Sequence, residues 1–483
     1  MRLEHAGQRR STTAREGRSG RPELETDNGV RMGIEPRPGF FFARGIGGMN
    51  LTTRALLGGV AFAAMAWAGA AYGQDDEPEI PPPPPPPPTI SDAIAGGKLI
   101  LESRLRYETV DQANIVKKAD ALTLRTRVGW ETGDFNNFRG LVEFEDVRQL
   151  GSEKYNIAVP GGASLNGKTT YPIINDPEVT ELNRLQVSWT PNGMFSTTVG
   201  RQRILFDDQR FVGNVGWRQD EQTFDAARFD VGYGKLKATY VYVDKVNRVL
   251  GEARDWTGNT HLLNATWSIS EQLKLQGFYY GLEFDNSVIN STETTGARAT
   301  GKVWAGLVQV AYGATFANQE PYADNHAVFD LDYYQADVSG TFDIYTVRLN
   351  YESLEGDGVR GFTTPLATTH AFNGWSDAFV SPGGNKSHID GLEDLSLSFV
   401  MRPRFRYAYW MNTELTVRYH DFDSQRTGVD LGHEWDAQVT AAITPKLSFL
   451  VKYADFHREA PVVGSAAPPP SRRKAWVSLE YKL

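Results

Sequence analysis

The sequence predicts an all-β fold: a transmembrane antiparallel β-barrel of about 18 strands, with short periplasmic turns and long extracellular loops. Three observations predict it. Apolar and charged residues alternate along most of the chain after residue 97, short and long connections alternate between these segments, and a secretory signal precedes them. The mean hydropathy is negative, which excludes a membrane protein built from apolar helices.

The first 73 residues are expected to lie outside the fold. Residues 1–48 contain nine Arg and many Gly and Ser, cannot bury a core, and are interpreted as a mis-annotated extension ahead of a start at Met49. Residues 49–73 have the parts of a signal peptide: the basic Arg54, an apolar run over 55–71, and a small-residue cleavage site that ends at Gly73. A short membrane anchor is the alternative, but the run is shorter than the about 20 residues that a spanning helix needs.

Residues 74–96 are predicted to form an acidic and proline-rich periplasmic linker. The eight prolines from Pro81 to Pro88 favour a polyproline II helix about 25 Å long. A stiff spacer is the simplest interpretation, and a docking site for a periplasmic partner is the alternative.

Residues 97–483 are predicted to form the barrel, because side chains alternate with a period of two. In the first segment Leu99, Leu101, Leu105 and Tyr107 share one face, and Glu102, Arg104, Arg106 and Glu108 share the other. The predicted strands lie near 97–108, 120–132, 138–148, 180–190, 195–203, 222–232, 235–245, 258–268, 272–284, 294–301, 305–317, 327–339, 341–353, 392–402, 411–423, 430–443, 446–457 and 474–483.

The connections favour a membrane barrel over a soluble sandwich or propeller. They are mostly tight after even-numbered strands, whereas the long ones, 149–179, 204–221, 246–257, 354–391 and 458–473, follow odd-numbered strands. The tight turns and the N-terminus would therefore be periplasmic. No blade repeat is present, and aromatic residues suited to interfacial girdles lie near strand ends: Tyr107, Trp130, Trp189, Trp267 and Tyr481. In the last strand, Leu483 stands where outer-membrane assembly signals usually end in an aromatic residue.

The charged faces are predicted to line the lumen, because lipid-facing charge costs about 2–4 kcal/mol at the bilayer midplane. Barrels of 16 to 18 strands leave an aqueous channel. Guanidinium forks suit carboxylates, so the wall would attract an anionic solute; the alternative is that Arg–Glu pairs only hold the barrel's shape. The predicted pore-lining residues are Arg104, Arg106, Arg125, Arg127, Arg139, Glu143, Arg184, Arg201, Arg203, Arg210, Arg228 and Arg348.

Composition and spacing argue against several other functions. The chain has no Cys, which excludes disulfides and thiol nucleophiles, and its net charge of −9 argues against nucleic-acid binding. The seven His after residue 73 show neither metal-ligand spacing nor a nucleophile motif, and the adjacent His420 and Asp421 would point to opposite faces of a strand. No cofactor and no enzymatic activity are expected. An enzymatic barrel and a plugged structural or adhesive barrel are the rival interpretations.

Three stretches resemble the alginate export family of outer-membrane barrels. They are GRQR at 200–203 with DDQRFVG at 207–213, WRQ at 217–219 and TFDA at 223–226; TPLATTHAFNGWSDAF at 364–379; and YHDF at 419–422 with EWD at 434–436. The resemblance covers roughly 98–483. It implies an 18-stranded monomer in the lipid of a Gram-negative outer membrane, inserted by the assembly machinery there, with an arginine-lined pore that passes an acidic polysaccharide or oligosaccharide. It also implies that Arg201, Arg203, Arg210 and Arg218 act together.

Several features stay open in the sequence. Arg210 and Arg218 could ring the extracellular mouth or fold inward, and an Arg–Asp-stapled loop is the alternative to a solute site. The 364–379 stretch could pack into the lumen as a constriction or cap the barrel. The turn near Thr444 is short, so no periplasmic plug is expected there, although the 149–179 loop could gate from outside. Export and uptake cannot be distinguished, and a general porin for small nutrients is a further alternative.

Overall fold

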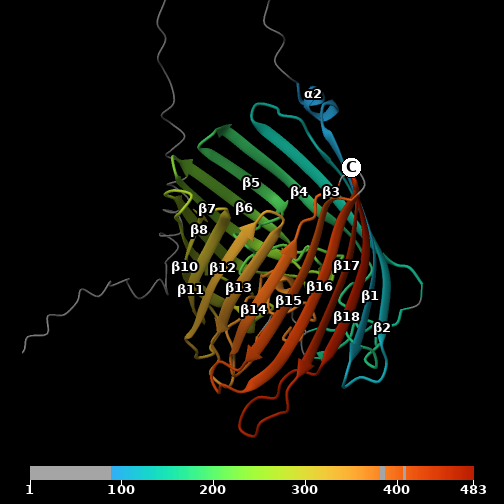
Figure 1. Cartoon of the computed structure of the whole chain (residues 1–483). Helices are drawn as coiled ribbons and strands as arrows, with labels where there is room; N and C mark the ends of the chain where they lie inside the picture. The colour runs from blue at the N-terminus through green and yellow to red at the C-terminus, as the bar shows by residue number, and fades with distance from the viewer. Residues whose placement is uncertain (1–88, 152, 160–161, 381–386, 406–409) are drawn as a thin grey trace, which may run out of the picture. The chain divides into compact units, whose positions relative to one another are not determined.

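The computed structural model describes residues 89–151, 153–159, 162–380, 387–405 and 410–483, which form a closed antiparallel barrel (Figure 1). Each strand pairs with its neighbours in sequence, and β1 closes the barrel by pairing with both β2 and β18. The predicted N-terminal extension, the signal peptide, and residues 74–88 with their polyproline run lie outside the described residues.

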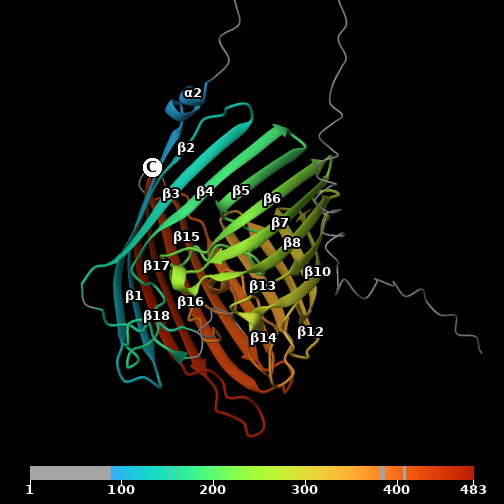
Figure 2. The ribbon, with the colours of Figure 1, turned by 180° about the vertical axis from the view of Figure 1, so that it is seen from behind.

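All 18 predicted strands are confirmed, with ends that differ by a few residues. Their bounds are β1 Lys98–Gln112, β2 Ala119–Glu131, β3 Phe138–Gln149, β4 Val179–Asn192, β5 Phe195–Gln202, β6 Thr223–Tyr233, β7 Leu236–Asn247, β8 Trp256–Ser268, β9 Lys274–Gly281, β10 Thr292–Ala305, β11 Val308–Pro321, β12 Leu331–Phe342, β13 Tyr345–Leu354, β14 Leu392–Met401, β15 Met411–Asp423, β16 Asp430–Thr444, β17 Leu447–Arg458 and β18 Arg472–Lys482. Seen from behind, β4–β8 pass in front of the wall that β13–β16 form (Figure 2).

The end of the predicted linker is helical rather than extended. The helix α2 (Ile90–Ala95) starts at Thr89, whose hydroxyl accepts from the Asp92 amide at 3.1 Å while the Asp92 carboxylate accepts from the Thr89 amide at 2.9 Å. Its carbonyls accept hydrogen bonds from Gly133 N at 2.8 Å and Trp130 Nε1 at 3.0 Å, so it is attached to the β2–β3 hairpin. Among the described residues, no helix is long and apolar enough to cross a membrane.

The two faces of the wall differ as predicted. On β1, Leu105 and Tyr107 are 36% and 40% exposed on the outer face, whereas Arg106 and Glu108 on the lumen face are each 1% exposed. The outer face of β3–β5 continues the pattern, with Phe144, Leu185 and Val199 all more than half exposed. An apolar outer surface is suited to lipid contact. Because side chains alternate along each strand, the charged ones point to the lumen.

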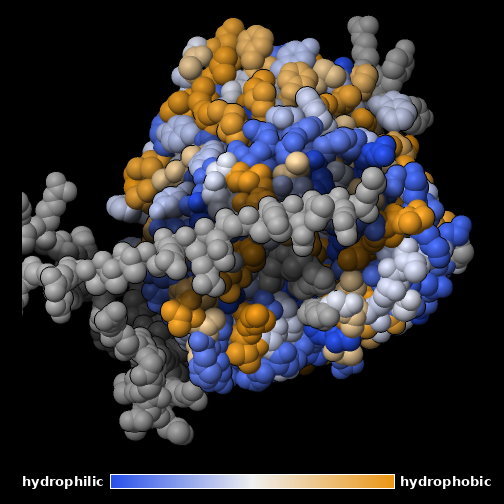
Figure 3. All heavy atoms as spheres, turned by 90° about the horizontal axis from the view of Figure 1, so that it is seen from below, coloured by the Kyte–Doolittle hydropathy of each residue, from blue (hydrophilic) through white to orange (hydrophobic). Residues whose placement is uncertain are grey.

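The short and long connections lie at opposite ends of the barrel. Tight two-residue turns join β6 to β7 and β10 to β11, where Gly234 and Gly306 have φ of 58° and 64°, a conformation that strains other residues. The turn between β16 and β17 contains only residues 445–446, as predicted. The connection over 402–410 is longer than the others at this end. Figure 3 views the long-loop end, where hydrophilic residues cover much of the surface.

Candidate functional site: a lumen crossed by two loops

Two long loop segments, 203–222 after β5 and 355–380 after β13, fold into the lumen and bind each other there. Val212 and Leu366 form a parallel bridge, the Gly213 amide donates to the Leu366 carbonyl at 2.8 Å, and the Thr368 amide donates to the Gln209 carbonyl at 3.0 Å. The 364–379 stretch is therefore part of a lumen constriction and not a cap over the mouth. We call 203–222 and 355–380 the crossing loops.

An apolar core fills part of the lumen between the crossing loops and the wall. The loops contribute Phe206, Val212, Phe362 and Leu366, all buried. They pack against inward-facing apolar residues of the wall, which are Phe224, Val241, Val243, Leu262, Phe278, Tyr280, Leu331, Tyr333, Leu392, Phe422 and Phe456. The predicted charged faces thus make up only part of the lumen wall, because the apolar side chains of the loops can leave water only by packing against an apolar stretch of wall.

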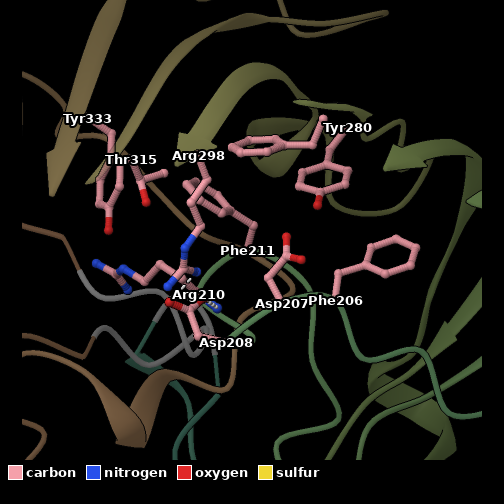
Figure 4. A pocket seen from close by; sticks show the side chains of 10 residues that line it. Phe206, Asp207, Asp208, Arg210, Phe211, Tyr280, Arg298, Thr315 and Tyr333 are labelled. Carbon is pink, nitrogen blue, oxygen red and sulfur yellow. Dashed lines mark hydrogen bonds and ion pairs between the residues drawn. The ribbon is translucent and has the colours of Figure 1, made fainter. Parts of the chain in front are cut away.

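The tip of the first crossing loop is attached to β8–β12 (Figure 4). Arg298 of β10 forms an ion pair with Asp208 at 2.6 Å, and Asn264 of β8 donates to Asp207 at 2.9 Å. Between them Phe211 lies against the rings of Phe278, at 5.0 Å, and Tyr333, at 5.3 Å between centroids. The loop is therefore held on this wall by both charge and aromatic packing.

Arg104 and Arg106 of β1 hold the opposite end of the same loop. Arg104 donates to Gln219 Oε1 at 2.9 Å and to the carbonyls of Gly216, at 3.0 Å, and Arg218. Arg106 donates to the Trp217 carbonyl and pairs with the Asp176 carboxylate of the 150–178 loop at 2.5 Å. Both arginines face the lumen as predicted, but their principal partners belong to loops.

A charge cluster on β2–β4 binds the end of the loop that leads into β6. Arg127 pairs with Glu145 and, at 3.3 Å, with Glu221, and Arg203 donates to Glu221 at 2.6 Å. Burial by itself would raise the pKa of the Glu221 carboxyl, but Arg127 and Arg203 outweigh it and lower that pKa to about 2. Burial, with Glu181 and Glu145 nearby, raises the pKa of its neighbour Asp220 well above the usual range.

The remaining predicted residues of this cluster are also paired. Glu143 is fully buried and accepts both arms of the Arg184 fork, at 2.9 and 2.6 Å, and Arg203 at 3.3 Å. Arg125 pairs with Glu480 of β18 at 2.9 Å. Here the lumen face is a network of alternating charges.

Arg210 of the first crossing loop is the centre of a third network. It is 2% exposed, pairs with Glu352 of β13 at 2.6 Å and donates to Asn373 Oδ1 of the second crossing loop at 3.1 Å. Its guanidinium lies 4.9 Å from the centroid of the Phe372 ring. Of the two expectations for Arg210 and Arg218, the inward one holds, because both are buried or nearly so against the barrel interior.

The structure corrects the placement of Arg201. It is directly opposite Leu185, whose side chain is 52% exposed on the outer face, so Arg201 lies on the outer face too and pairs there with Asp225 at 2.7 Å. β5 is continuous through Gly200, so Val199 and Arg201 share the outer face; the strand ends at Gln202, and Arg203 beyond that end returns to the lumen.

Three further predicted arginines face the lumen outside these networks. Arg139 is 58% exposed at the periplasmic end of β3, with Asp134 3.9 Å away. Arg228 is paired with Asp230 of its own strand at 2.8 Å, and Arg348, 46% exposed, lies 3.3 Å from Asp337. The contacts that any of these residues make with a solute stay a prediction.

Sequence reasoning missed the part of the site on β15–β18. Glu434 accepts hydrogen bonds from the Ser376 amide at 2.7 Å and hydroxyl at 2.6 Å, and Lys474 pairs with Asp377 at 2.8 Å. Lys452 and the fully buried Trp476 also face inward and are opposite each other in the register. The period of two in the sequence could have identified these residues as inward-facing, because Lys452, Lys474 and Trp476 alternate with the outward Val451 and Val477.

Replacing Gly374 by alanine is expected to displace the second crossing loop. Gly374 has φ of 79°, which costs a residue with a Cβ about 1–3 kcal/mol, and the new methyl group would collide with the Glu434 carboxylate. Single-channel recording should show longer open times than in the wild type. Gly464→Ala is the matched control, since Gly464 has φ of 93° but open space around it in the 459–471 loop. Equal open times in Gly374→Ala and Gly464→Ala would contradict the role of this contact.

Comparison with known proteins supports the fold and shows a resemblance to one family. Residues 98–322 match the family model for alginate export, so two of the three resembling stretches, 364–379 and 419–436, lie beyond the matched part. Among curated proteins, none matches this chain.

Solved structures with the same fold are outer-membrane proteins of Pseudomonas aeruginosa. OpdK with vanillate is 13% identical with a TM-score of 0.62, and the match covers 81% of this chain and 99% of that one. OccK9 (OpdG) is 12% identical with a TM-score of 0.61, covering 81% and 100%, and OccK8 (OprE) is 11% identical with a TM-score of 0.59, covering 81% and 99%. At these identities the likeness shows the fold alone. Residues 98–322 are thus similar to the alginate export family, and the chain is a β-barrel protein of the Gram-negative outer membrane.

Proposed function

We propose that this protein is a passive outer-membrane channel that prefers anionic solutes, with an acidic, alginate-like polysaccharide or oligosaccharide as the leading solute. The family match and the barrel support a channel rather than an enzyme. The observation that carries the anion preference is the set of partners of Arg104 and Arg106. Both guanidiniums are held mainly by groups of loops, so withdrawal of the loops leaves two neighbouring cations facing the lumen, with Glu108 of β1, 4.0 Å from Arg106, as the remaining wall carboxylate.

A solute carboxylate can take the place of those loop groups. The Trp217 and Arg218 carbonyls and the Asp176 carboxylate all accept from the two guanidiniums, as a uronate carboxylate would. Arg125 and Arg127 continue the cationic surface on β2, but each retains a wall carboxylate, Glu480 or Glu145. They contribute less to the preference for anions because their charge is already compensated.

A second candidate is a channel for small carboxylates. The crossing loops occupy much of the lumen, which favours a small solute over a polymer for as long as they stay in place. Vanillate, the molecule named with the OpdK structure, is a small aromatic carboxylate. The two candidates share the cationic surface and differ in how far the loops must move.

The ion preference can be measured in planar bilayers. Under a salt gradient, the reversal potential should show anion selectivity, and the double variant Arg104→Gln, Arg106→Gln should lose much of it. Arg139→Gln is the control, because that side chain is 58% exposed at the rim and its charge is screened by solvent. Block by polyuronate supports the polysaccharide, and block by vanillate alone supports the small carboxylate. A cation-selective wild-type current would overturn the anion preference.

A further inference from the structure

Lys452 of β17 contacts both crossing loops at once. Its ammonium lies 4.1 Å from the ring centroid of Trp217 in the first loop and 3.8 Å from that of Trp375 in the second. It is also 3.1 Å from Nε2 of His370 in the second loop, and the lysine is 5% exposed. One cation on the wall therefore joins the two loops to each other and to the barrel.

His370 is enclosed in the same cluster and is held in one tautomer. The ring stacks on Trp217 at 4.2 Å and meets Trp476 edge-on at 5.4 Å. A carboxylate can only accept, so the proton of the neutral ring is on Nδ1, and Nε2 accepts from the Lys452 amino group, which keeps N–H donors in either protonation state. That nitrogen lies 3.1 Å from both carboxylate oxygens of Asp377, to which it donates.

Positive charge predominates around the His370 ring. Asp377, its one carboxylate partner among the described residues, is shared with Lys474 at 2.8 Å and with Arg218 at 3.6 Å. The titratable groups that face the cluster from the elements packed around it are Arg106 and Glu108 of β1, Asp176 of the 150–178 loop, Arg218 of the first crossing loop, Arg418 of β15, Glu434 and Asp436 of β16, Lys452 of β17, and Arg472 and Lys474 of β18.

A proton on His370 would remove the contact with Lys452. Nε2 would then donate and would lie 3.1 Å from the Lys452 ammonium, whose three N–H groups are also donors. Two cations would therefore be in contact. Burial lowers the pKa of His370 well below its ordinary value, and Lys452 lowers it further against the opposing effect of Asp377. At neutral pH the ring is therefore neutral and the contact is intact.

We propose that His370 is a proton-operated latch of the channel: its neutral imidazole holds both crossing loops against β17 and β18, and acidification releases them. This inference rests on the proposed channel function but not on the preference for anions. It requires only that the crossing loops obstruct the lumen and that their attachment depends on an uncharged ring.

The direction of the pH dependence follows from linkage. The released loop exposes His370 to water, where its pKa is about 6.5, so the released state binds a proton more readily than the attached state. The attached state is thus most strongly favoured above about pH 6.5 and loses stability as the pH falls below it. The ratio of released to attached loops should rise by up to about tenfold for each pH unit of that fall.

Hydrogen exchange tests the release directly and does not depend on conduction. Backbone exchange over 364–379, corrected for its intrinsic pH dependence, should be at least about tenfold faster at pH 5 than at pH 7.5 in the full-length protein in detergent micelles. In planar bilayers the open probability should rise over the same range. If loop exchange is unchanged between the two values, the latch is wrong, whether or not the barrel conducts.

Variants separate the latch from a general effect of acid. His370→Gln keeps one acceptor and one donor but cannot be charged, so its exchange should be the same at both pH values. Lys452→Met removes the opposing cation and should reduce the response to pH, which gives a second test if His370→Gln does not fold. His457→Gln is the matched control, because His457 lies on β17, the strand that carries Lys452, and its side chain is 58% exposed. It should respond like the wild type, and a wild-type response in His370→Gln would overturn the proposal.

Discussion

Replacing Arg210 by alanine is expected to raise the ratio of open to closed channels by two orders of magnitude or more. The side chain is 2% exposed and pairs with Glu352 at 2.6 Å, so its removal leaves a buried carboxylate without its cation. Breaking such a pair costs about 3–5 kcal/mol, and each 1.4 kcal/mol is a factor of ten. This cost destabilises the closed arrangement of the loops, because Arg210 also joins the two loops through Asn373.

Single-channel open probability measures this effect. A double variant and a control variant test whether the Arg210 network is its cause. In Arg210→Ala, Glu352→Ala no buried charge is left alone, so the double variant should open less than the single one. Arg228→Ala is the matched control, since this lumen arginine pairs with Asp230 on its own strand and contacts neither crossing loop. If Arg210→Ala opens no more often than Arg228→Ala, the Arg210 network does not hold the constriction.

Replacing Arg127 by alanine is expected to be the most destabilising single change in the wall. Arg127 lies between Glu145 and Glu221, both buried, and Glu102 is 3.5 Å away. Its loss leaves two buried carboxylates close together, at a cost of about 3–5 kcal/mol. Urea unfolding in detergent should show a correspondingly lower free energy of unfolding at pH 7. Arg139→Ala, at the exposed end of the neighbouring strand, should change it by less than about 0.5 kcal/mol.

The same variant should respond differently to acid. The folded-state pKa of Glu221 is about 2, below its ordinary 4.5, so the Glu221 carboxylate stabilises the folded protein above about pH 4.5, and this stability is lost as the pH falls toward 2. Without Arg127 the folded-state pKa rises and the loss shrinks. The difference in unfolding free energy between wild type and Arg127→Ala should therefore be smaller at pH 3 than at pH 7. An equal difference at both values would show that Arg127 does not set this pKa.

Arg201 shows where a period-two argument fails. Its position near Arg203 predicted that both would line the lumen, and alternation along an uninterrupted strand would place them on one face. β5 ends at Gln202, which lies between them, and Arg203 reaches Glu221 inside while Arg201 reaches Asp225 outside. The residue at which a strand ends is not visible in the spacing of charged residues, so the sequence could not distinguish the two arginines.

The apolar residues of the crossing loops are visible in the sequence, but they do not show whether the loops cap the barrel or enter it. The segments 203–222 and 355–380 contain Phe206, Phe211, Phe362 and Leu366, which a solvated loop would leave exposed to water. Their apolar content was compatible with either a cap or a constriction. Only the pairing of Val212 with Leu366 and the inward aromatic residues of the wall decide for the constriction.

The sequence by itself determined the local properties of this protein: the alternation that makes 18 strands, the direction in which charged faces point, and the ends at which short and long connections lie. These depend on a period of two and on residues close together in the chain. The tertiary structure alone decided that Arg104 holds a loop more than 100 residues away and that His370 meets Lys452 across 82 positions. Such contacts arise when barrel closure and loop entry bring distant segments together, and no spacing along one chain records them.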